Sequence, residues 1–251
     1  MGARCVEVLV RPHPPPAPSL VTAPVLSEPA TNPLAAADCP NSLDHPIFSE
    51  SIRLIRAALE PEAALQGLSP IQQDVVLRLV HSSGDLSLVP AVRFSPGACE
   101  QGAQALASGS VILTDTAMAA AAVQPMARRC FGNAVRSVLD WAPERAPQGS
   151  TRTAAGMAQA LVEHPGALVL IGSAPTALEV LLELVHTGAT AAPALVIGMP
   201  VGFVGVAESK RHLAESSLPQ IRLEGSRGGA GLVGAAANAL LRWAWLRQPP
   251  T

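Results

Sequence analysis

The chain has 251 residues, of which 49% are apolar and only 14% charged, so it can bury one sizeable core. Its formal charge of −2 gives no electrostatic reason to expect nucleic acid or an anionic membrane as a partner. No apolar run reaches the roughly 18 residues of a membrane span, and the start lacks the apolar core of a signal peptide. These features favour a cytoplasmic protein.

The cysteines show no pattern typical of a metal site. Their positions carry no C-x-x-C pair and no histidine at metal-ligand spacing: Cys5, Cys39, Cys99 and Cys130. We therefore expect buried, reduced thiols and no bound metal, which fits a reducing compartment.

Residues 1–42 differ from the rest because proline crowds them, with five prolines between Pro12 and Pro18. Proline blocks helix and removes backbone donors, and the small polar residues around it bury little surface. We predict a disordered, proline-rich extension over 1–42, followed by one α/β domain over 43–247. An accessory tail is favoured over a docking segment.

Two helices are expected at the start of the domain. Apolar residues step along one face from Pro46 until Pro61 ends the first helix. Ser69-Pro70 is typical of an N-cap followed by proline at the first helical position, and Gly84 is the expected stop. A third helix is expected from Ser95-Pro96 to about Ser108.

Short apolar runs then alternate with helical patterns. The expected strands are 110–114, 135–139, 167–171, 194–197 and 220–223, and the expected helices begin near 116, 151, 176, 207 and 231. Nearly continuous apolar strands separated by helices predict parallel pairing with both sheet faces covered. The expected fold is a three-layer α/β/α, doubly wound, mainly parallel five-stranded sheet, whose ligands bind beyond the carboxyl ends of the strands.

Glycine-rich loops follow three of these strands, over 172–176, 198–210 and 225–231. Neither G-x-G-x-x-G nor the Walker spacing is present, so nucleotide binding is poorly supported. Each loop alone is weak evidence, but three at corresponding strand ends indicate a ligand whose polar edge is bound by backbone N–H groups. Asp115, after the first of the strands, is interpreted as a helix cap.

His81 is the histidine best placed for proton chemistry. It follows Arg78 by three residues, so both side chains leave one face of the second helix near its end. The negative helix end favours imidazolium, whereas Arg78 opposes it, and we expect the two effects to leave the pKa near 6.5. A histidine that merely caps its own helix is about equally compatible with the local sequence.

Two further arginines lie where an anionic ligand would be held. Arg152 follows the cap residue Thr151, where a cation opposes the helix dipole, so a carboxylate partner is expected about as strongly as a plain surface position. Arg227 stands among the glycines after the last strand.

Taken together, these motifs resemble those of the precorrin-8X and cobalt-precorrin-8 methylmutases of corrin-ring biosynthesis. The resemblance covers about residues 46–240, with small departures at Ser173 and at Ala122, where glycine is usual. The matching segments are Pro46-Ile47, 51–55, 78–81 with Gly84-Asp85, Thr151-Arg152, 171–178, 198–210, 225–229 and 238–240.

The resemblance implies an intramolecular methyl migration from carbon 11 to carbon 12 of a tetrapyrrole, giving hydrogenobyrinate or its cobalt form. It further implies a flavodoxin-like homodimer with its site near the subunit interface, His81 as the acid/base residue, and Ser51 and Arg78 as substrate contacts. A sigmatropic shift needs a proton delivered and removed but no cofactor. The substrate's many carboxylates give Arg78, Arg152 and Arg227 acceptors to bind.

Two other interpretations stay open. A non-catalytic tetrapyrrole-binding protein would share the pocket and the arginines but would not need His81 to ionise. A flavodoxin-like nucleotide-binding module is the weaker alternative, because the phosphate fingerprints are missing.

Overall fold

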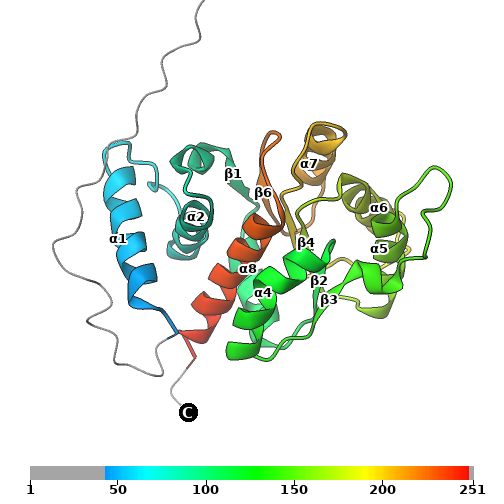
Figure 1. Ribbon diagram of the computed structural model, residues 1–251, viewed down its shortest axis with the longest axis horizontal. Helices are drawn as coiled ribbons and strands as arrows, with labels where there is room; N and C mark the ends of the chain where they lie inside the picture. The colour runs from blue at the N-terminus through cyan, green and yellow to red at the C-terminus, as the bar shows by residue number, and fades with distance from the viewer. Residues whose placement is uncertain (1–42, 249–251) are drawn as a thin grey trace, which may run out of the picture.

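The computed structural model describes residues 43–248 (Figure 1). The predicted extension over 1–42 lies outside the described residues. The helices are α1 (Pro46–Leu59), α2 (Pro70–Ser83), α3 (Ala98–Ala107), α4 (Ala117–Arg129), α5 (Arg152–Glu163), α6 (Pro175–His186), α7 (Val206–Glu215) and α8 (Ala230–Trp245), with short 3-10 helices η2 (Leu86–Ala91) and η3 (Val138–Trp141). The strands are β1 (Val92–Phe94), β2 (Ile112–Thr114), β3 (Val135–Ser137), β4 (Leu168–Ile171), β5 (Leu195–Gly198) and β6 (Gln220–Leu223).

The sheet has six strands in the order β1-β6-β5-β4-β2-β3. The five predicted strands are all present and pair in parallel. Counted from β2, they follow the order 2-1-3-4-5 of flavodoxin-like folds. The expected count of five was too low, because β1 adds an antiparallel edge strand beside β6, with Val92 opposite Leu223. β1 is only three residues long and lies between Pro90 and Pro96, so no alternating pattern revealed it.

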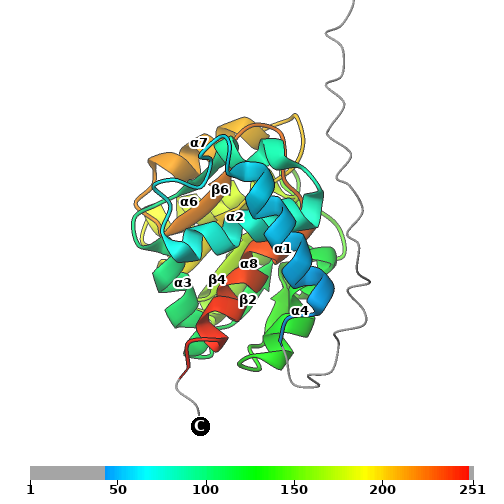
Figure 2. The ribbon, with the colours of Figure 1, turned by 90° about the vertical axis from the view of Figure 1, so that its left-hand side faces the viewer.

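Helices cover both faces of this sheet, as the doubly wound prediction requires. One core joins α2, α3, α4 and α8 to the sheet, and α1 packs on the outer side of α2 (Figures 1 and 2). The other core lies under α5, α6 and α7. No helix within residues 43–248 combines the length and the apolar character needed to cross a membrane.

Local capping explains where α2 begins and ends. Ser69 accepts from the backbone of Gln72 while the Gln72 side chain accepts from the Ser69 backbone, a reciprocal capping box. Gly84 closes the helix in the left-handed region with φ 67°. The next helix starts later than expected: Gly97, not Ser95, precedes α3. The second predicted strand, 135–139, is also shorter, because the chain turns into η3 after Ser137.

Candidate functional site

Three of the predicted site residues meet where α1 lies on α2. His81 is in the last turn of α2, and its Nδ1 lies 2.7 Å from Oγ of Ser51 on α1. The guanidinium of Arg78 lies over the Phe48 ring at 4.4 Å, and the same ring meets His81 edge to face at 5.1 Å. The predicted shared face of Arg78 and His81 is thus confirmed, with Phe48 packed against both side chains.

The environment moves the pKa of His81 away from its ordinary value. Burial lowers this pKa below 6.5, and the positive charge of Arg78 lowers it further. The expectation of an unshifted pKa was wrong, because it weighed the helix end against Arg78 and omitted the desolvation that α1 imposes. Burial also lowers the pKa of Arg78. The free protein therefore favours neutral imidazole.

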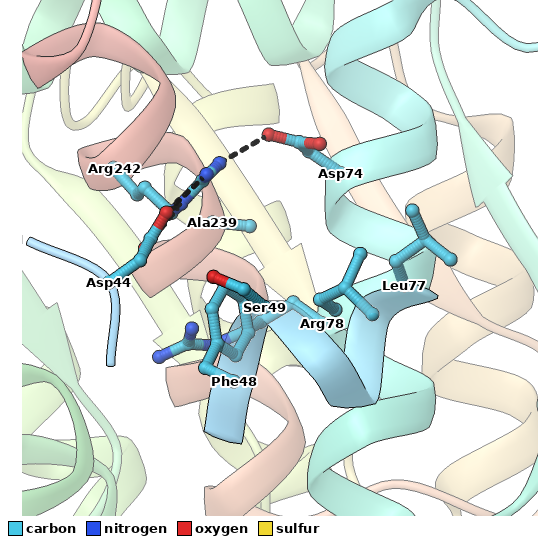
Figure 3. A pocket seen from close by; sticks show the side chains of 9 residues that line it. Asp44, Phe48, Ser49, Asp74, Leu77, Arg78, Ala239 and Arg242 are labelled. Carbon is cyan, nitrogen blue, oxygen red and sulfur yellow. Dashed lines mark hydrogen bonds and ion pairs between the residues drawn. The ribbon is translucent and has the colours of Figure 1, made fainter. Parts of the chain in front are cut away.

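Beside Arg78 lies a cavity of about 200 Å³ (Figure 3). Phe48, Ser49 and Ile52 come from α1, Asp74, Leu77 and Arg78 from α2, and Ala239 and Arg242 from α8, with Asp44 preceding α1. The cavity is smaller than the 300–1,000 Å³ of a typical small-molecule site. It can receive one carboxylate arm, whereas a macrocycle would have to lie outside it.

An ion network joins the three helices around this cavity. Arg242 pairs with Asp44 at 2.5 Å and with Asp74 at 2.9 Å, and its guanidinium lies 5.7 Å from the Phe48 ring centre. Sequence reasoning missed these acids and Arg242, because they are 30 to 198 positions apart and only the tertiary fold brings them together. Phe48 lies three residues before Ser51 on α1, and this spacing was the available sequence signal that the two side chains share a face.

The other two predicted arginines bind protein oxygens. Arg152 begins α5, which covers the opposite sheet face from α2, and its Nε donates to the carbonyl of Pro143 at 2.8 Å (Figure 1). Arg227 donates to Asp85 and Ser87, just beyond the end of α2. The structure does not bring Arg152 beside His81, and it places Arg227 in contact with the segment that follows the His81 helix.

Several N–H groups of the glycine-rich loops bind carbonyl groups of a neighbouring loop. Gly229 N donates to the Met199 carbonyl at 2.9 Å, and Gly202 N donates to the Ser226 carbonyl at 3.0 Å. A Cβ on Gly172 would lie 2.7 Å from backbone atoms of Gly229 and Ala230, so glycine is required for this close approach. The expectation that these loops hold a ligand through backbone donors is therefore weakened.

The start of α6 is likewise filled from within the chain. Oδ2 of the fully buried Asp115 accepts from the backbone N–H groups of Gly172, Ser173 and Ala174 at 2.5–3.0 Å. Burial raises the pKa of Asp115, and the three N–H donors oppose that rise. Asp115 therefore binds the loop after β4, and its prediction as a helix cap was wrong, because the N-cap of α4 is Thr116. Within residues 43–248 no group of three His, Cys, Asp or Glu side chains is placed to hold a metal.

The parallel sheet order defines a flavodoxin-like α/β protein, in which His81 lies between α1 and α2 on one face of the sheet. Residues 46–243 match the family model of precorrin-8X methylmutase. The chain belongs to this family of isomerases.

Proteins similar to this chain are named as methylmutases, and each matches it over most of its own length. The cobalt-precorrin-8 methylmutase of Synechocystis is 36% identical over 81% of this chain and 97% of its own length. The precorrin-8X methylmutase of Pseudomonas aeruginosa is 41% identical over 77% of this chain and 93% of its own length. The crystal structure of precorrin-8X methyl mutase from Thermus thermophilus is 41% identical and superposes with a TM-score of 0.68, over 79% of this chain and 95% of that one.

Proposed function

We propose that this chain moves a methyl group from carbon 11 to carbon 12 of precorrin-8X or cobalt-precorrin-8, giving hydrogenobyrinate or cobyrinate. The observation that carries the proposal is the contact of His81 with Ser51 and with Phe48, whose ring also contacts the Arg78 guanidinium. The sigmatropic shift needs a proton on the macrocycle while the methyl group migrates, and that proton must leave afterwards. One imidazole held beside the ring can perform both transfers, which contributes about 10²–10⁴-fold.

Ser51 suits a histidine that changes charge during the reaction. A hydroxyl both donates and accepts, so its oxygen accepts from Nδ1–H of imidazolium and its O–H donates to Nδ1 when that nitrogen is bare. With Nδ1 held at 2.7 Å, Nε2 is the atom left to exchange a proton with the substrate. Ser51 therefore orients the imidazole as well as bordering the substrate.

Arg78 is the proposed anchor for a substrate carboxylate. Its guanidinium lines the 200 Å³ cavity and lies on the Phe48 ring, so a carboxylate arm that enters this cavity meets a positive charge already held in place. Arg152 and Arg227 stay predictions as further carboxylate contacts, because each already donates to protein oxygens.

A direct assay tests the proposal. Purified protein is incubated with precorrin-8X and separately with cobalt-precorrin-8, and the visible spectrum reports formation of the product. We expect turnover of one or both, and His81→Ala to abolish turnover while product binding survives. Product binding with no turnover by the wild type would instead identify a tetrapyrrole-binding protein. Turnover by His81→Ala at the wild-type rate would refute the catalytic role.

We also propose that the protein works as a homodimer in the cytoplasm. The cavity beside Arg78 is too small for a macrocycle, and a second copy packed over this face would enclose a ring that lies outside it. The loop after β5 offers a contact surface, since Phe203 and Val204 are 94% and 88% exposed. The buried free thiols Cys99 and Cys130 are compatible with a reducing cytoplasm.

Light scattering tests the dimer. We expect the wild type to have twice the chain mass, and Phe203→Ser with Val204→Ser to give a monomer with reduced turnover. Val162→Ser removes an equally apolar, 66% exposed side chain from α5 and serves as the control. A fully active wild-type monomer would contradict the proposal.

A further inference from the structure

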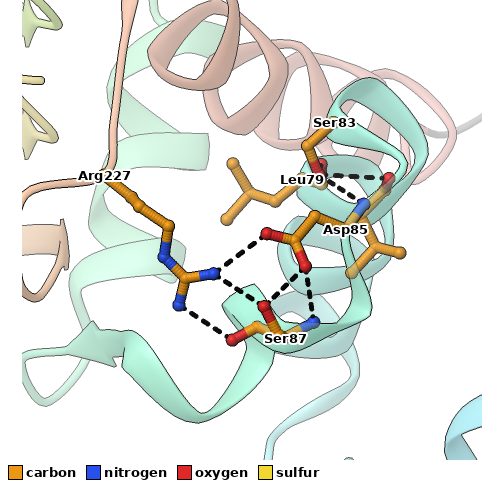
Figure 4. Close-up of polar contacts among 6 residues, drawn as sticks. Leu79, Ser83, Asp85, Ser87 and Arg227 are labelled. Carbon is orange, nitrogen blue, oxygen red and sulfur yellow. Dashed lines mark hydrogen bonds and ion pairs between the residues drawn. The ribbon is translucent and has the colours of Figure 1, made fainter. Parts of the chain in front are cut away.

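Arg227 bridges two parts of the chain that are 140 residues apart (Figure 4). Its Nη1 donates to Oδ2 of Asp85 at 2.9 Å and to Oγ of Ser87 at 2.8 Å, and its Nη2 donates to the Ser87 carbonyl at 2.9 Å. We call this set of three residues the Arg227 clasp. The planar guanidinium thus binds the start of η2 through both terminal nitrogens, a geometry that lysine cannot reproduce.

The segment that the clasp holds is continuous with the His81 helix. Asp85 follows the C-cap Gly84, and the Asp85 backbone N–H donates to Oγ of Ser83 at 3.1 Å. The Ser83 hydroxyl in turn donates to the Leu79 carbonyl at 2.9 Å, within the same final turn that carries His81. A chain of hydrogen bonds therefore links Asp85 to the last turn of α2.

Arg227 itself is held at the carboxyl ends of the strands. Lys210, the only lysine of the chain, is 3% exposed, and its Nζ donates to the carbonyls of Gly225 and Arg227 at 2.7 Å each. The neighbouring Ser226 carbonyl accepts from Gly202 N at 3.0 Å. Arg227 therefore extends from a loop that α7 and the loop after β5 hold in place.

We propose that the Arg227 clasp is the positioning device for His81, an inference that rests on the proposed function. Helix ends fray, and the last turn of α2 has to keep an imidazole in register with a bound macrocycle. The clasp ties that turn to the carboxyl edge of the sheet, where ligands of this architecture bind. Its contribution is geometric, because ion pairs as exposed as Arg227 and Asp85 add little to stability, whereas a 1 Å error in position can reduce a rate about 10²-fold.

A double-mutant cycle tests this role. Arg227→Ala and Asp85→Asn are each expected to lower kcat about tenfold and to leave KM within about twofold, and the double variant should be no slower than the worse single one. Arg227→Lys keeps the positive charge but lacks the two terminal nitrogens that donate together, so it should resemble Arg227→Ala. Arg211→Ala, which breaks the exposed pair of Arg211 with Glu215 on α7, is the matched control and should keep wild-type kcat.

A second readout separates positioning from general stability and from substrate contact. Proton NMR of the His81 ring should show a changed pKa and chemical shift in Asp85→Asn at a temperature where circular dichroism shows a folded protein. An unchanged His81 signal with unchanged kcat would overturn the proposal. So would a raised KM in Arg227→Ala that Asp85→Asn does not share, since this outcome means direct contact with the substrate. The NMR result remains informative even if the wild type shows no methylmutase turnover.

Discussion

The pKa of His81 is set by neighbours that a substrate would change. In the free protein, burial and Arg78 both lower it. A substrate rich in carboxylates brings negative charge to Arg78 and to the imidazole, and an opposite charge nearby favours imidazolium. We therefore expect bound substrate to raise the pKa of His81 and so to favour the form that donates a proton.

This coupling predicts different pH profiles for the free and bound enzyme. Imidazolium is the donating form, so the rate falls as pH rises through the pKa of His81. The basic limb of kcat/KM, which reports the free enzyme, should lie below pH 6.5, because the pKa is lowered from that value. The limb of kcat should lie at higher pH. Stopped-flow rates across pH 5–9 check this, and a kcat limb at or below that of kcat/KM would contradict it.

The hydrogen bond from Ser51 gives a second prediction. Ser51→Ala removes the partner of His81 Nδ1 and leaves the ring free to turn, so kcat should fall about tenfold, the equivalent of about 1.4 kcal/mol. Ser51→Thr keeps the hydroxyl and should recover most of the rate. Single-turnover kinetics distinguish the effect from weaker binding. Equal losses in both variants would show that the hydroxyl is not the important group.

Individual site residues were predictable only where the helical repeat placed them together. The three-residue spacing of Arg78 and His81 was enough to predict one face. The contact of His81 with Ser51 depends on the packing of α1 against α2, and nothing in the local sequence fixes that distance. The pKa shift was missed for the same reason, since desolvation is a property of the packed site and not of a helix end.

At the scale of elements, α8 is the helix against which the others are arranged. It packs on α2, α3 and α4 (Figure 2). Arg242 near its end pairs with Asp44 before α1 and with Asp74 on α2 (Figure 3). Close packing against α4 requires a small residue, because a Cβ on Gly234 would lie 2.7 Å from Cβ of Ala122.

Gly234→Ala should therefore destabilise the fold even though alanine is the better helix former. Overpacking costs about 1–3 kcal/mol, and the propensity gain of about 1 kcal/mol offsets only part of it. Adding Ala122→Gly removes the opposing methyl and should restore most of the loss. Gly231→Ala, in the same helix but with open space around its Cβ, should be neutral or stabilising by about 0.5 kcal/mol. Urea unfolding measures all three, and equal losses at 231 and 234 would refute the packing argument.

Across the whole molecule, the parallel sheet was predictable because its strands are apolar on both faces. β4 and β5 are buried at every residue, which leaves a continuous signal in the sequence. β1 pairs only at the edge and includes Arg93, so its sequence resembles a loop. Topology alone predicts a ligand at the carboxyl ends of the strands, whereas the loop-to-loop hydrogen bonds there are visible only in the three-dimensional structure.

The position of the buried cores along the chain predicts where the chain can be shortened. The described cores lie between Leu43 and Ala244, and Asp44 already pairs with Arg242, so a protein of residues 43–251 should unfold within about 1 kcal/mol of the full chain. Its turnover should be unchanged, because Phe48, Ser51 and His81 are retained. A protein that begins at residue 61 lacks α1, exposes the α2 face that α1 covers, and should lose both cooperativity and turnover. Urea midpoints and the spectral assay check both forms, and loss of stability or rate in the 43–251 form would mean that residues 1–42 belong to the functional domain.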